Sequence, residues 1–245
     1  MDVRGGALSG RGAALARHAV APWRDLLDGL DHVLEGRASR LAVVFAGLAV
    51  GWWIYVPVHE LLHAAGCLAA GGGVERLEID PLYGAALLSR LFPFVHAGGD
   101  YAGRLSGFDT GGSDLVYLAT DLAPFALALL PGLWAVRVAV RRGLPFWFGA
   151  ALPAAFSPWL SLSGDAYEIG SLAVTNLAPW RAQRALLLGD DLILRAQELA
   201  ALGGAPWGGF LLAAALGLLW AVATTALGSL LAAKLGEPAP VARAR

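Results

Sequence analysis

The sequence predicts an all-α polytopic membrane protein with about four transmembrane helices and short extramembrane loops. Two observations favour this fold class. Hydrophobic residues make up 57% of the chain and charged residues only 15%, whereas soluble domains carry about 25% charged residues. Several apolar runs also reach the length of about 20 residues that a helix needs to cross a bilayer.

Polar segments separate the predicted membrane spans. They cover residues 41–70, 115–140, 144–162 and 207–235. Three glycines at 71–73 end the first span, because glycine favours the backbone conformation at a helix C-terminus. Residues 74–80 then alternate apolar and charged side chains, which is typical of a short strand. A second polar region follows the third span at 166–206.

The chain divides into three parts by composition. Residues 1–40 are expected to form a flexible segment followed by an amphipathic helix, because apolar residues recur at helical spacing from Trp23 onward. Residues 41–235 are expected to form the membrane-embedded domain. Residues 236–245 form a basic tail.

The distribution of basic residues predicts the orientation in the membrane. With four spans, the N-terminal segment, the turn at 141–144 and the C-terminal tail share one side, which holds 12 of the 18 Lys and Arg residues. Because cytoplasmic loops are enriched in basic residues, both termini are expected in the cytoplasm. The net charge of −1 gives no indication of nucleic-acid binding. Contact with the lipid bilayer is expected instead.

The first predicted span carries the motif His59-Glu60-Leu61-Leu62-His63. On a helix, residues i and i+4 share a face, so His59 and His63 can bind one metal ion. Glu60 points to the neighbouring face, where it can take a proton from a metal-bound water. The alternative is that both histidines are helix residues hydrogen bonded to their neighbours. Polar groups in lipid are costly, which favours the metal site.

A catalytic zinc site needs three protein ligands and an open position for water. The first and third spans run in the same direction, and Asp165 lies at about the depth of His59 when both helices rise about 1.5 Å per residue. Asp165 is therefore the predicted third ligand. Glu168, one turn further on, is the alternative ligand, and a helix N-cap is the alternative role for Asp165.

Three further polar residues have open roles. Asp121 is a helix-start charge, a hydrogen-bond partner of a histidine, or a ligand. His96 and Asp100 lie in the glycine-rich connection between the first two spans and are weaker ligand candidates. We expect the site to open to water near residues 97–113 or 166–206.

These residues together resemble the intramembrane zinc metalloproteases of the site-2 protease class. More closely, they resemble the short bacterial membrane proteins of the zincin peptidase type that are related to that class. The resemblance covers residues 41–176 and rests on His59-Glu60-x-x-His63, on Asp121-Leu122-Ala123-Pro124-Phe125 and on Ser163-Gly164-Asp165. It implies a three-helix core and a strand-like segment after the motif helix, matched by residues 74–79.

The resemblance also implies an activity. Zn²⁺ would be held by His59, His63 and Asp165, and Glu60 would act as general base in hydrolysing peptide bonds of membrane proteins or peptides. It implies an integral protein of the bacterial inner (cytoplasmic) membrane. The alternative function is a non-catalytic metal-binding membrane scaffold or regulator.

Overall fold

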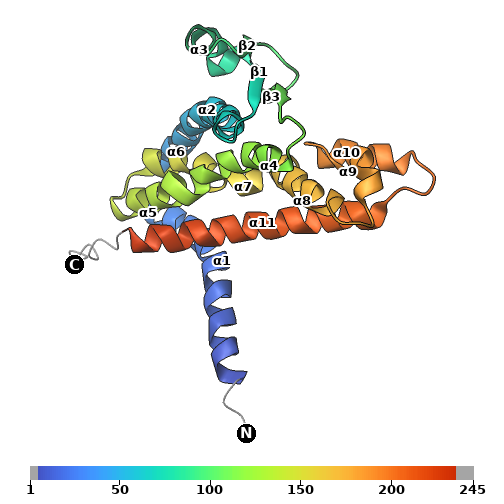
Figure 1. The fold of residues 1–245 in the computed structure, drawn as a ribbon. Helices are drawn as coiled ribbons and strands as arrows, with labels where there is room; N and C mark the ends of the chain where they lie inside the picture. The colour runs from blue at the N-terminus through green and yellow to red at the C-terminus, as the bar shows by residue number, and fades with distance from the viewer. Residues whose placement is uncertain (1–4, 236–245) are drawn as a thin grey trace. The chain divides into compact units, whose positions relative to one another are not determined.

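The computed structural model describes residues 5–235, so the predicted basic tail 236–245 lies outside the described residues. The helices and strands are α1 (Gly5–Leu34), α2 (Ala38–Ala69), β1 (Gly73–Ile79), α3 (Ala85–Leu91), β2 (Val95–Ala97), β3 (Gly103–Asp109), α4 (Asp114–Leu122), α5 (Leu133–Arg141), α6 (Pro145–Ala155), α7 (Ser157–Leu160), α8 (Asp165–Thr175), α9 (Arg184–Leu187), α10 (Leu192–Ala200) and α11 (Trp207–Lys234) (Figure 1). Short 3₁₀ turns lie at Pro81–Tyr83, Ala123–Phe125 and Arg181–Gln183, and a π turn at Ala128–Gly132.

Three helical stretches of the described chain are long and apolar enough to cross a membrane. They are α2, the stretch Asp114–Arg141 that runs from α4 through α5, and α11. These match the predicted spans at 41–70, 115–140 and 207–235. The predicted span at 144–162 is interrupted, because α6 ends at Ala155 and a separate α7 follows. Pro158 has no backbone N–H to donate to the preceding turn, so a continuous helix cannot pass through this point without losing a hydrogen bond.

The chain forms two compact units. The first contains the described residues of Met1–Trp52, Leu127–Ser157 and Val222–Arg245, and the second contains Trp53–Ala126 and Pro158–Ala221. The helices α2 and α11 each contribute residues to both units. The candidate site described below lies entirely within the second unit.

The first unit is helical, and a partly buried arginine links three of its helices. The guanidinium of Arg137 on α5 donates to Asp25 of α1 at 2.7 Å and to the carbonyl of Ser229 on α11 at 2.9 Å. The core of the first unit contains the fully buried side chains of Val33, Leu133 and Phe148. A guanidinium shared between a carboxylate and a carbonyl satisfies polar groups that would otherwise be costly among apolar helices.

A three-stranded sheet in the second unit corrects the all-α prediction. The strand order is β2-β1-β3, with β1 parallel to β2 and antiparallel to β3. Leu77 and Ile79 of β1 are fully buried in a cluster that includes Ala64 of α2. The sheet therefore packs on the segment of α2 that follows the motif. The alternating pattern predicts β1, whereas the glycines in and around β3 leave no such pattern.

The helices around the motif approach one another closely. A Cβ atom added to Gly66 of α2 would lie 2.5 Å from the carbonyl oxygen of Ala119 on α4. One added to Gly170 of α8 would lie 2.0 Å from the carbonyl oxygen of Ala213 on α11. Glycine at these two positions lets the backbones pack together, and this packing fixes α4 and α8 within the second unit.

Candidate metal centre

His59 and His63 lie one turn apart on α2 and face the same side. Both are buried, each with 7% of its surface exposed. Their Nε2 atoms are 3.2 Å apart. The i, i+4 spacing thus brings both rings to one point, as the motif predicts.

Asp165 is the first residue of α8 and meets the two histidines. Its Oδ2 atom lies 3.1 Å from Nε2 of His59, and its Oδ1 atom lies 3.5 Å from Nε2 of His63. The helix N-cap is Gly164, so the alternative role of Asp165 as N-cap is wrong. Among the described residues, this trio is the group whose donor atoms all lie within 4.8 Å of one another.

The spacing of these donors fits a metal ion. Zinc bonds of about 2.0–2.1 Å at tetrahedral angles place ligand atoms about 3.3 Å apart, and the observed separations are 3.1, 3.2 and 3.5 Å. Apart from its 3.1 Å approach to Nε2 of His59, the buried Oδ2 atom of Asp165 also accepts no hydrogen bond. A buried carboxylate oxygen without a donor is costly, which favours a cation at this position.

Both imidazole rings are oriented by a second hydrogen bond. Nδ1 of His63 donates to the carbonyl oxygen of Thr120 at 2.9 Å, since that oxygen can only accept. Nδ1 of His59 lies 3.0 Å from the hydroxyl of Tyr55. A proton on Nδ1 of His63 leaves the lone pair of its Nε2 free, as a metal ligand requires.

The metal-binding group borders a cavity of about 550 Å³ that Glu60 also lines. Other wall residues come from β3 and from the segment 189–191, within the two regions where an opening was expected. The acidic side chains that line the cavity are Glu60, Asp121, Asp165, Glu168, Asp190 and Asp191. Arg104 of β3 pairs with Asp190 at 2.8 Å. The cavity is therefore strongly acidic.

Glu60 is positioned by the first residue of β3. A Cβ atom added to Gly103 would lie 2.4 Å from Cγ of Glu60. The strand thus passes directly against the glutamate side chain, and the space for Glu60 depends on a glycine there. This contact explains why a sheet beside α2 matters to the site.

Glu168 is not part of the metal-binding group. Its carboxylate accepts a short hydrogen bond from the hydroxyl of Tyr117 on α4. Burial raises the pKa of the Glu168 carboxyl above its usual range, and the hydrogen bond from Tyr117 opposes this shift. The structure thus brings Asp165, and not Glu168, to the histidines.

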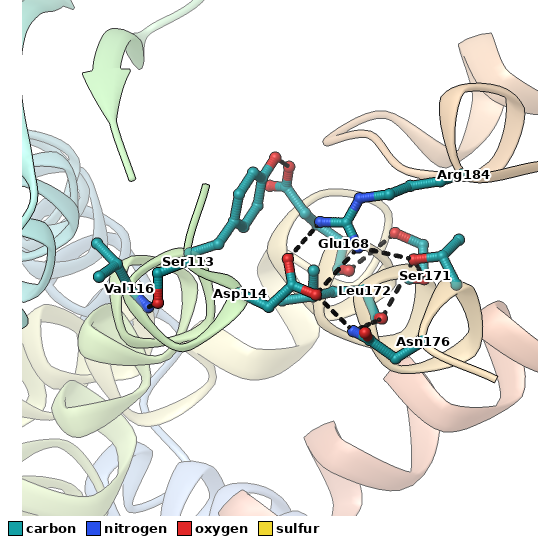
Figure 2. Close-up of polar contacts among 10 residues, drawn as sticks. Ser113, Asp114, Val116, Glu168, Ser171, Leu172, Asn176 and Arg184 are labelled. Atoms are coloured by element: carbon teal, nitrogen blue, oxygen red, sulfur yellow. Dashed lines mark hydrogen bonds and ion pairs between the residues drawn. The ribbon is translucent and has the colours of Figure 1, made fainter. Parts of the chain in front are cut away.

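The carboxylate of Asp114 at the start of α4 contacts Asn176, at the end of α8, and Arg184, the first residue of α9. Figure 2 shows the carboxylate of Asp114 between the guanidinium of Arg184 and the amide of Asn176. The two distances are 2.6 Å from Nη2 of Arg184 and 2.7 Å from Nδ2 of Asn176. This contact holds the helix that carries Thr120 against the helix that carries Asp165.

The remaining candidates are not part of the metal-binding group. His96 and Asp100 are exposed, and neither belongs to the trio. Asp121 lines the cavity, while its neighbour Thr120 provides the hydrogen bond to a histidine. Tyr55 was not singled out from the sequence, although its i−4 spacing from His59 places it on the same helix face.

No protein-family model, curated protein or solved structure matches this chain.

Proposed function

We propose that this protein is an intramembrane zinc metalloprotease that hydrolyses peptide bonds of membrane-associated substrates. The observation that carries the proposal is the buried group of His59, His63 and Asp165 beside an acidic cavity that Glu60 also lines. Two of these ligands lie on a helix apolar enough to cross a membrane. Such groups are rare in these helices unless they have a function.

Zinc is the proposed metal because two imidazoles and one carboxylate are among its usual ligand sets. Three protein ligands also leave one position for water, as catalytic zinc sites do. Bound zinc would supply an activated water and would polarise the carbonyl of the substrate. With zinc on the Nε2 atoms, Nδ1 of His59 would donate to the hydroxyl of Tyr55 and Nδ1 of His63 to the carbonyl of Thr120, which keeps both rings oriented for this role.

Glu60 is the proposed general base. It would take one proton from the attacking water as the oxygen–carbon bond forms. It would then deliver that proton to the leaving amine as the carbon–nitrogen bond breaks, so the carboxylate is regenerated. Gly103 leaves the space in which the Glu60 side chain lies against β3.

The proposed location is the bacterial cytoplasmic membrane, with both termini in the cytoplasm. The spans α2, Asp114–Arg141 and α11 support membrane insertion. A same-side arrangement of the termini needs a fourth crossing, for which the interrupted stretch at 144–162 is the candidate. Substrates would be membrane proteins or peptides whose scissile segment can leave its helix.

The Glu60→Gln variant tests the proposal. Membrane proteomes of cells that carry this variant are compared with those of cells that carry the unaltered protein, and purified variant protein is assayed for metal. We expect a substrate to accumulate uncleaved while the zinc content is unchanged. Unaltered cleavage by the variant would contradict the proposal. Bound zinc without cleavage by either protein would favour the scaffold or regulator.

A further inference from the structure

Two buried carboxyl groups in the cavity have no part in the chemistry proposed above. Asp121 on α4 is 3% exposed and Glu168 on α8 is 8% exposed. Both line the cavity together with Glu60 and His63. The negative charge of Glu168 acts electrostatically on Asp121. We refer to them as the acidic pair.

The hydrogen-bonding capacity of the acidic pair is only partly satisfied by the described residues. Oδ2 of Asp121 is buried and accepts no hydrogen bond. The neighbouring hydroxyl of Thr120 donates to the carbonyl of Val116 instead, at 2.9 Å. Glu168 accepts one hydrogen bond, from Tyr117. Two buried carboxyl groups, one with an oxygen that accepts no hydrogen bond, are costly to ionise unless a positive charge joins them.

The cations that line the cavity are already engaged. Arg104 pairs with Asp190 at 2.8 Å, and His63 binds Thr120 and faces Asp165. A second metal ion is not favoured, because among the described residues the acidic pair has no third His, Cys, Asp or Glu close enough to complete a group. A cation that pairs with these two carboxyl groups therefore comes from a ligand that enters the cavity.

We propose that Asp121 and Glu168 bind an ammonium or guanidinium group of the peptide substrate, beside the metal centre. The inference rests on the proposed function only in taking that ligand to be a peptide. A lysine or arginine side chain near the scissile bond, or a free N-terminal amine, supplies this chemistry. The pair then acts as a specificity site: Asp121 follows Thr120, which orients His63, so a bound cation lies next to the peptide being cut.

Peptide binding to the Glu60→Gln protein, which is expected not to cleave the peptides, tests this inference. The full-length Glu60→Gln protein in liposomes is titrated with fluorescent apolar peptides of about 25 residues, N-terminally acetylated, with one lysine placed at each position of a central window. The matched set carries norleucine in place of lysine. A third set has norleucine and a free N-terminal amine. We expect the best lysine peptide, or the free-amine peptide, to bind at least about tenfold more tightly than acetylated norleucine peptides.

The substitutions Asp121→Asn and Glu168→Gln, singly and together, remove the negative charges with little change in shape. We expect the preference for the charged peptide to fall several-fold in each single variant and to vanish in the double variant. The matched control is Arg104→Gln with Asp190→Asn, which removes an ion pair from the same cavity without changing its net charge. That control keeps the preference.

Any of three results would overturn the inference. The first is equal binding of charged and neutral peptides, and the second is a charge preference that survives the double substitution. The third is loss of a second equivalent of zinc in the double variant, which would mean that the pair binds a metal ion. The binding experiment also tests this inference separately from the proposed protease activity. A charge preference that depends on Asp121 and Glu168 stands even when the unaltered protein cleaves none of the peptides, and that lack of cleavage counts against the protease alone.

Discussion

Nδ1 of His63 lies 2.9 Å from the carbonyl oxygen of Thr120, and this hydrogen bond joins the motif helix to the second candidate span. Because a carbonyl only accepts, Nδ1 carries a proton, and Nε2, which faces Asp165, is the nitrogen left to bind a metal ion. The backbone of α4 thereby sets the tautomer of a proposed metal ligand. Because the partner of His63 is a main-chain carbonyl, a side-chain substitution cannot remove it. The side chains that bind the metal or orient its other ligands can be replaced.

Replacing Asp165 with alanine is expected to weaken zinc binding by at least about 100-fold, because the third ligand is lost. Chelator competition on purified protein measures this affinity. The matched control is Glu168→Gln, which changes an acidic residue one turn away that lies outside the metal-binding group. Unchanged zinc affinity in Asp165→Ala excludes Asp165 as a ligand.

Tyr55→Phe removes the hydroxyl beside Nδ1 of His59 and leaves the aromatic ring. We expect zinc affinity to fall by about 10- to 100-fold, the usual effect of losing the hydrogen bond that orients a metal-binding histidine. The same competition experiment applies. Tyr101→Phe is the control, since Tyr101 lines the cavity and does not contact either histidine ring in the described contacts. Equal losses in both variants would argue against a specific role for Tyr55.

Gly103→Ala introduces a Cβ atom into the space of the Glu60 side chain. The expected result is a kcat about 10- to 100-fold lower with full zinc content, because a displaced base no longer reaches its proton. A peptide identified from the Glu60→Gln proteome comparison provides the assay. Gly203→Ala is the control, because a Cβ atom there meets nothing within 4 Å. Wild-type turnover in Gly103→Ala would show that Glu60 has another position available.

Asp114→Ala breaks the contacts with Arg184 and Asn176 that tie α4 to α8 (Figure 2). The pair is partly exposed, so we expect a loss of about 1 kcal/mol in the free energy of unfolding. Denaturant unfolding in detergent measures it. Glu198→Ala, which breaks a pair within α10, is the control and should cost less. A loss no larger than in this control would mean that the Asp114 contacts add nothing to the packing of α4 on α8.

The sequence predicted the trio better than it predicted the elements that carry it. His59 and His63 follow from helical spacing alone, because i and i+4 share a face whatever the surroundings. Asp165 was predicted by comparing depths along two continuous spans, yet the structure interrupts the span at 144–162 and still brings Asp165 to the histidines. Its position depends on the packing of α8 through Gly170, which no local pattern reports.

The sheet and the cavity were the least predictable parts. The strand β1 follows from alternating side chains, but β3 owes its place to pairing with β1 and to the glycine that fits against Glu60. The contact between Tyr117 and Glu168 joins residues far apart in the chain, as does the pair Arg104–Asp190. Such contacts arise from tertiary packing, so composition and spacing carry no signal for them.

Zinc K-edge X-ray absorption of the purified, full-length protein tests the central claim most directly, because it reports the metal and its ligand atoms together. The account predicts about one zinc per chain, bound by two imidazole nitrogens and by oxygen at about 2.0–2.2 Å, with the imidazole contribution reduced in His59→Ala. Absence of stoichiometric zinc, or a sulfur ligand at about 2.3 Å from the single cysteine, Cys67, would contradict it.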